Sequence, residues 1–123
     1  MPRFVVVVED SESLASSLAL AIETIPDVKA LVAHHPEAAL GLLTTYPDIS
    51  ALLTDLNLPA FDGFELIDRV RQLETYKDLP AIMITAEESI KLADNGERSR
   101  PNAILQKPFS PREVRRVLES LLA

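Results

Sequence analysis

Short apolar runs alternate along the chain with segments in which apolar residues recur every three or four positions. The recurring segments have the spacing of amphipathic helices, and the short runs have the length and the β-branched content of strands. Strands and helices that alternate in this way favour a parallel sheet with helices on its faces. We expect strands over Phe4–Val8, Val28–Ala33, Ile49–Thr54, Ala81–Thr85 and Ala103–Gln106.

Four helices have clear apolar stripes, and a fifth is weaker. The last helix has the clearest start, because Ser110 can cap it, Pro111 suits its first position and Glu113 completes a capping box. Residues 87–97 give the weakest helical pattern, and Gly96 is expected to end it. The four clear stripes contain Leu14, Leu18, Ile22 and Ile25; Ala39, Leu42, Leu43 and Tyr46; Leu66, Ile67, Val70 and Leu73; and Val114, Val117, Leu118 and Leu121.

Five strand–helix units in 123 residues predict one α/β domain over residues 1–123. An open, doubly wound sheet is favoured, since a closed barrel of eight units needs a longer chain. The chain has no cysteine, which excludes disulfides and thiolate metal sites. No stretch is apolar enough to span a bilayer and the N-terminus lacks a secretory pattern, so we expect a cytoplasmic protein with no membrane contact.

The formal net charge of −7 makes nonspecific nucleic-acid binding a poor hypothesis. The charge is uneven, because residues 1–90 carry 5 basic and 15 acidic side chains whereas residues 91–123 carry 7 basic and 4 acidic ones. This asymmetry indicates two different faces.

Polar residues follow four of the predicted strands. Glu9 and Asp10 follow the first, Asp55 ends the third, Thr85 ends the fourth and Lys107 follows the fifth. In an open α/β sheet the functional groups gather beyond the carboxyl ends of the strands. If the first, third, fourth and fifth strands lie side by side, these groups therefore share one edge.

Three neighbouring carboxylates repel one another, and a divalent cation such as Mg²⁺ would relieve that repulsion. Asp10 and Asp55 are the natural direct ligands, and Glu9 could act through water. Lys107 would instead hold an anion near the metal, and a phosphoryl group suits it, with Thr85 donating a hydrogen bond. Asp55 would then accept the phosphoryl group.

Four stretches together resemble the motifs of the receiver domain of two-component response regulators. They are "VVVVEDSE", "LLTDLNLPAFDG", "MITA" and "QKPFS", and the resemblance covers essentially the whole chain. It implies a flavodoxin-like sheet of strand order 2-1-3-4-5 flanked by five helices. It also implies phosphotransfer to Asp55 from a histidine kinase or a histidine phosphotransfer protein, in a signalling domain rather than an enzyme.

The resemblance assigns further roles. The main-chain carbonyl of Asn57 joins Glu9, Asp10 and Asp55 at the Mg²⁺ site, where Mn²⁺ could substitute. Thr85 is the switch hydroxyl, Lys107 the ion-pairing lysine, and the Lys107–Pro108 bond is cis in the family. Asn57 and Glu87 occupy positions that tune dephosphorylation.

One position departs from the family pattern. An aromatic ring is usual three residues before the lysine, and this chain has Ile104 there. The usual aromatic switch therefore cannot operate. We expect a downstream partner to use residues 87–122, where five arginines could meet an acidic surface, and a homodimer is possible. These arginines are Arg98, Arg100, Arg112, Arg115 and Arg116.

Two other functions stay open. A pseudo-receiver would only bind partners, but such domains lose the aspartate, an acid or the lysine. A haloacid-dehalogenase-like phosphatase uses similar groups, but it places its nucleophile after the first strand, usually within Asp-x-Asp. Here the acidic pair comes first, and Asn57 stands where the second acid would be. The adjacent His34 and His35 should point to opposite faces and not form one site.

Overall fold

Five parallel strands form one sheet in the order β2-β1-β3-β4-β5, which confirms the predicted fold class and strand order. The structure is a computed structural model, and it describes residues 2–86 and 98–123. The observed strands are β1 (Arg3–Val8), β2 (Val28–Ala33), β3 (Ile49–Asp55), β4 (Ala81–Thr85) and β5 (Ala103–Gln106). They agree with the predicted strands to within one residue at each end.

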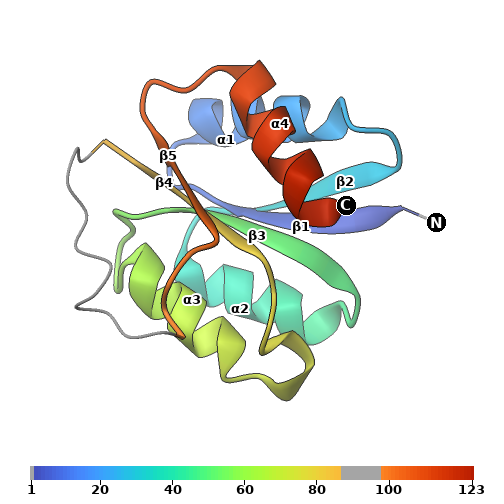
Figure 1. Cartoon of the computed structure of the whole chain (residues 1–123). Helices are drawn as coiled ribbons and strands as arrows, with labels where there is room; N and C mark the ends of the chain where they lie inside the picture. The colour runs from blue at the N-terminus through green and yellow to red at the C-terminus, as the bar shows by residue number, and fades with distance from the viewer. Residues whose placement is uncertain (1, 87–97) are drawn as a thin grey trace.

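Helices cover both faces of the sheet (Figure 1). Helices α1 (Glu12–Glu23) and α4 (Pro111–Leu122) lie together on one face, whereas α2 (Pro36–Thr45) and α3 (Gly63–Arg71) lie on the other. A short 3-10 turn, η1 (Glu74–Tyr76), follows α3 and was not predicted. The predicted helix over residues 87–97 lies outside the described residues, so four α-helices are described where the resemblance implies five.

Each described α-helix begins at a side chain that caps it. Ser110 accepts a hydrogen bond from the Glu113 N–H at 3.1 Å, as the sequence predicts for α4. Asp62 caps α3 by accepting from the Glu65 N–H at 2.9 Å. A capping side chain satisfies one of the N–H groups that the first helical turn leaves without a partner. The loops that follow the strands therefore end at defined residues.

Alternate residues of the strands pack into two separate hydrophobic clusters. In β1, Val5 and Val7 face the α1 and α4 side, whereas Val6 and Val8 face the α2 and α3 side. All four side chains are buried. An apolar run with no polar position is therefore explained by a central strand that is covered on both faces.

The strand register aligns the carboxyl ends of the central strands. Val8 pairs with Thr54, Asp55 with Ile84, and Thr85 with Gln106. The residues that follow these pairs therefore emerge at one edge of the sheet. Among the described residues, no helix combines the length and the apolar character that crossing a membrane requires.

The Arg71 guanidinium joins α3 to the residues that precede β5 through hydrogen bonds. It donates hydrogen bonds to the main-chain oxygens of Leu79, Arg98 and Arg100, and to the Asn102 side chain at 2.8 Å. The same Asn102 oxygen accepts from the Ala81 N–H at 2.8 Å, at the start of β4. This network holds the strand that ends next to Lys107.

Tyr76 makes a buried polar contact that predicts a measurable loss of stability. Its hydroxyl donates to the Tyr46 carbonyl and accepts from the Ile49 N–H at 3.2 Å. Because Tyr76→Phe leaves both main-chain groups without this partner, we expect it to lower the free energy of unfolding by about 1.5 kcal/mol, measured by urea denaturation. Tyr46→Phe is the matched control, since its ring keeps the contact with Phe4 at 5.5 Å, and equal losses in both variants would contradict this explanation.

Candidate functional site

Three carboxylates meet at the carboxyl edge of the sheet. Glu9 and Asp10 directly follow β1, and Asp55 is the last residue of β3. Each offers an oxygen that lies within 4.8 Å of the others. Glu9 and Asp55 are buried and Asp10 is exposed, so the cluster opens to solvent on one side.

Lys107 reaches this cluster from the end of β5. Its ammonium donates to Asp55 Oδ2 at 3.0 Å and lies 3.6 Å from Glu9 Oε1. Burial alone would lower the pKa of Lys107, but its interactions with Asp55 and Glu9 outweigh burial and raise that pKa. The lysine is therefore a permanent cation at this edge, and its bond to Pro108 is cis, as the resemblance implies.

Glu9 is a buried carboxylate whose hydrogen-bonding capacity the protein fills only in part. Oε2 accepts a hydrogen bond from the Ser11 N–H at 3.1 Å, whereas the buried Oε1 accepts none from the described residues. Burial raises the pKa of Glu9 to about 7, and the nearby Asp10 and Asp55 add to the effect. A buried oxygen without a donor, beside two other carboxylates, fits a cation of the Mg²⁺ type, for which carboxylate oxygens are preferred ligands.

The raised pKa of Glu9 predicts a pH dependence of stability. In the unfolded chain the pKa of this carboxyl is the ordinary 4.5, whereas in the folded protein its pKa is about 7. The folded protein binds this proton more tightly than the unfolded chain does, and the protonated form of Glu9 therefore favours folding. This contribution is fully present below the lower pKa and is lost as the pH rises through the higher one. In EDTA we expect the free energy of unfolding to fall by about 2 kcal/mol between pH 5 and pH 8 relative to Glu9→Gln.

Urea denaturation curves of the wild type and of Glu9→Gln at several pH values would measure this difference. Adding Mg²⁺ should reduce the loss at pH 8, because a bound cation favours the ionised carboxylate. If the wild type and Glu9→Gln changed in parallel across this pH range, a raised pKa for Glu9 would be wrong.

Asp55 is held by the loop that leads into α3. The Asn57 N–H donates to Asp55 Oδ1 at 3.3 Å, and the Gly63 N–H donates to the Leu56 carbonyl at 2.8 Å. A Cβ atom on Gly63 would lie 2.6 Å from the Asp55 carbonyl oxygen, so only glycine allows this close approach.

Of the other predicted residues, Thr85 and Asn57 lie at the same edge. Thr85 is buried at the end of β4, and its carbonyl accepts from the Lys107 N–H at 2.8 Å. Asn57 is exposed beside Asp55. Ile104 is half-buried in β5 and pairs with Met83 of β4. Glu87 lies outside the described residues.

The two histidines contact different parts of the protein. His35 caps α2 by accepting from the Ala38 N–H at 3.2 Å, and His34 Nδ1 lies 3.0 Å from the Glu9 carbonyl oxygen. The contact of His34 with the acidic pair was not anticipated. The available signal was the pairing of the first two strands, which puts the residues that follow Ala33 beside those that follow Val8.

The fold and this cluster define a receiver domain. Residues 5–119 match the family described as response regulator receiver domain, and the chain belongs to that family. A chemotaxis protein CheY homolog of Campylobacter jejuni is 32% identical over 116 residues, which cover 94% of this chain and 89% of that protein.

Solved structures agree with this assignment. A putative response regulator from Chloroflexus aurantiacus has a TM-score of 0.87 and 31% identity, with 99% of this chain and 98% of that one covered. The chemotaxis response regulator CheY4 of Vibrio cholerae has a TM-score of 0.87 and 25% identity, with 99% and 100% covered. The chain is therefore a CheY-like receiver, which supports a role in two-component signalling.

Proposed function

We propose that Asp55 accepts a phosphoryl group from the phosphohistidine of a histidine kinase or histidine phosphotransfer protein. The observation that carries this proposal is the contact of a buried aspartate with Lys107 at 3.0 Å, beside two further carboxylates. A carboxylate at a strand end can act as a nucleophile when nearby cations offset the charge of the incoming phosphoryl oxygens.

The transfer balances without a further reactant. An Asp55 carboxylate oxygen forms a bond to phosphorus while the phosphorus–nitrogen bond of the phosphohistidine breaks. The imidazole nitrogen keeps the electron pair, and because the other ring nitrogen of the phosphohistidine carries a proton, the donor leaves as neutral histidine. Water later cleaves the acyl phosphate, which releases inorganic phosphate and regenerates the Asp55 carboxylate. The domain modifies only itself, so we do not class it as an enzyme.

Glu9, Asp10, Asp55 and the main-chain carbonyl of Asn57 would hold Mg²⁺, and Mn²⁺ could replace it. When bound, the cation supplies positive charge that neutralises carboxylate and phosphoryl oxygens. Lys107 would bind a phosphoryl oxygen, since its ammonium already contacts the acceptor. Thr85 would donate a hydrogen bond to another.

Phosphorylation would act through a surface that includes residues 98–122 of the described chain. The expected output partner carries acidic groups that meet the arginines of this surface, and self-association through the same face is the alternative. Ile104 cannot supply the ring movement of the usual switch. Asn57 and Glu87 would tune the lifetime of the phosphorylated state. We place the domain in the cytoplasm, with no direct role in nucleic-acid binding.

Intact-mass measurement after incubation with acetyl phosphate tests this proposal. With Mg²⁺ we expect a gain of one phosphoryl mass that hydroxylamine removes, as is expected of an acyl phosphate. EDTA should prevent the gain. Absence of an adduct with acetyl phosphate, and with a phosphorylated histidine phosphotransfer domain, would favour the pseudo-receiver. Turnover of p-nitrophenyl phosphate without a stable adduct would favour a phosphatase.

A further inference from the structure

The loop between β3 and α3 is fixed at both ends. At its start the Leu56 N–H donates to the Ile84 carbonyl at 2.9 Å, and at its end Asp62 caps α3. Between these ends lie residues 57–61, which include Asn57. The position of the Asn57 carbonyl therefore depends on what holds the middle of the loop.

Side chains hold most of that middle part. Its one hydrogen bond between main-chain atoms among the described residues joins the Phe61 N–H to the Pro59 carbonyl at 3.0 Å, within the loop itself. At the start of this part the Asn57 N–H also donates to the Asp55 side chain at 3.3 Å. Leu58 and Phe61 pack against the core cluster on the α2 and α3 side. The loop therefore contacts the body of the protein mainly through these two apolar side chains.

The tip of the loop has an unfavourable backbone conformation. Ala60 has a φ of 74°, and the bond from Phe61 to Pro59 closes a three-residue turn around it. Turns of this kind with positive φ are rare, and alanine adopts positive φ much less readily than glycine or asparagine. Surrounding contacts must keep Ala60 in place, because the residue itself favours a different conformation.

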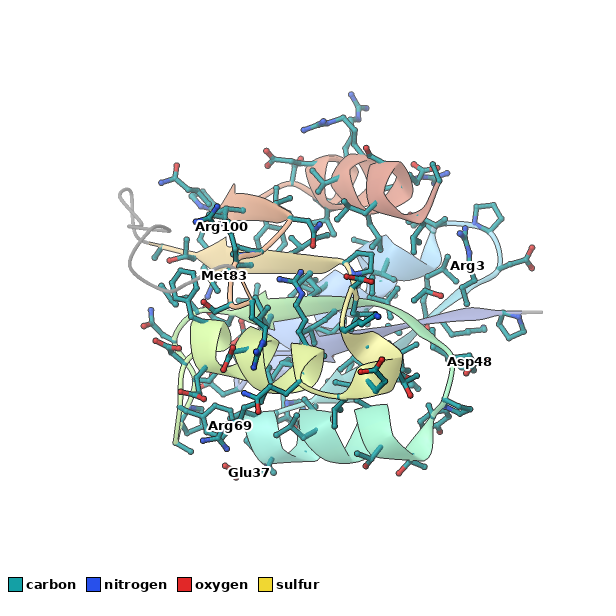
Figure 2. The ribbon with its side chains drawn as sticks, turned by 60° about the horizontal axis from the view of Figure 1, so that its bottom comes forward. Arg3, Glu37, Asp48, Arg69, Met83 and Arg100 are labelled. Carbon is teal, nitrogen blue, oxygen red and sulfur yellow. The ribbon has the colours of Figure 1, made fainter. Side chains whose placement is uncertain are left out.

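Arg69 of α3 supplies such a contact. Its guanidinium lies 4.0 Å from the centroid of the Phe61 ring, and its Nε donates to Glu65 at 3.0 Å. Figure 2 shows Arg69 on the side of the molecule opposite to Asp48, which precedes β3. The Phe61 ring is thus held between the hydrophobic core and an arginine that is itself fixed by an ion pair.

We propose that Arg69 is a positioning residue for the cation site, because it covers Phe61 and so keeps the strained turn at Ala60 closed. The loop then keeps Asn57 beside Asp55, whose Oδ1 accepts from the Asn57 N–H at 3.3 Å. This inference rests on the proposed function in one respect, namely that the Asn57 carbonyl is a cation ligand. Arg69 has no contact with Glu9, Asp10 or Asp55 among those the structure describes, so it acts through the loop.

Mg²⁺ titrations followed by amide NMR at 25 °C test the inference, with circular dichroism to show that each variant is folded. We expect Arg69→Gln to bind Mg²⁺ about threefold more weakly, the factor that corresponds to an exposed cation–π contact. Simple electrostatics predicts the opposite, since removing a positive charge favours cation binding. Phe61→Leu should weaken binding similarly, and Phe61→Tyr should not.

A second substitution separates positioning from a general loss of structure. Ala60→Asn accepts positive φ, so adding it to Arg69→Gln should restore the wild-type affinity. Lys77→Gln is the charge control, because Lys77 is exposed and lies beyond η1. Unchanged or tighter Mg²⁺ binding by Arg69→Gln would overturn the inference, and so would failure of Ala60→Asn to restore binding.

The experiment also separates this inference from the proposed function. Wild-type protein that binds no Mg²⁺ would contradict the proposed cation site. In that case the metal-free spectra still decide the role of Arg69, since loss of its contact should shift the amide signals of residues 57–61 other than Pro59. Signals in this range that match the wild type would overturn the positioning role.

Discussion

Replacing Asp55 with Asn should abolish the gain of phosphoryl mass from acetyl phosphate or from a phosphorylated histidine donor. The amide keeps the size of the carboxylate but lacks a nucleophilic anion, so the oxygen–phosphorus bond cannot form at a useful rate. Lys107 would keep its contact with Glu9, which lies 3.6 Å away. The variant should therefore fold, as circular dichroism can verify.

Asp48→Asn is the matched control for this substitution. Asp48 is exposed and directly precedes β3, whereas Asp55 ends the same strand. The two residues thus lie at opposite ends of one strand, and Asp48→Asn should be phosphorylated like the wild type. If Asp55→Asn gained the same phosphoryl mass and lost it equally readily, another residue would be the acceptor and the proposed site would be wrong.

Replacing Gly63 with Ala should cause the largest loss of stability among the substitutions considered. The new Cβ atom would lie 2.6 Å from the Asp55 carbonyl oxygen, 3.2 Å from Leu56 Cα and 3.1 Å from Met83 Cε. The methionine, labelled in Figure 2, can move its flexible end, but the main-chain atoms cannot yield without shifting the end of β3. We expect the free energy of unfolding to fall by about 3 kcal/mol.

The same shift should impair phosphorylation, because it displaces the acceptor from Lys107. We expect the initial rate with acetyl phosphate to fall by about 10-fold or more in the fraction that remains folded. Urea denaturation and the rate of mass gain measure the two effects. Gly41→Ala is the control, since a Cβ atom there meets nothing within 4 Å, and it should stabilise α2 by about 1 kcal/mol. Equal stability of the two variants would contradict the steric argument.

Local patterns were sufficient for the strands and most of the helices. The run Phe4–Val8 became the central strand β1, and Ser110 caps α4 as predicted. These predictions succeed because burial on both faces requires an uninterrupted apolar run, and because a cap depends on residues within one turn. The turn η1 escaped prediction, since its buried Tyr76 bonds to residues about thirty positions earlier.

The site was predictable for a related reason. The charged groups that meet there, Glu9, Asp10, Asp55 and Lys107, stand at or just after predicted strands, and in a parallel sheet the ends of such strands meet at one edge. Only the tertiary structure gives the lengths of the contacts, such as 3.0 Å between Lys107 Nζ and Asp55 Oδ2. It also shows that Glu9 Oε1 has no donor among the described residues. The loop contact between Phe61 and Arg69 had no sequence signal, because eight positions separate residues from different elements.

By itself the sequence determined which residues form strands, where the helices begin and which charged groups stand at strand ends, because each of these depends on neighbours along the chain. The tertiary structure alone decided how closely the charges approach, which carboxylate oxygen is buried without a donor among the described residues, and how Ala60 is kept at positive φ. These features arise from contacts between segments far apart in the chain, where distance and solvent exclusion set the energy.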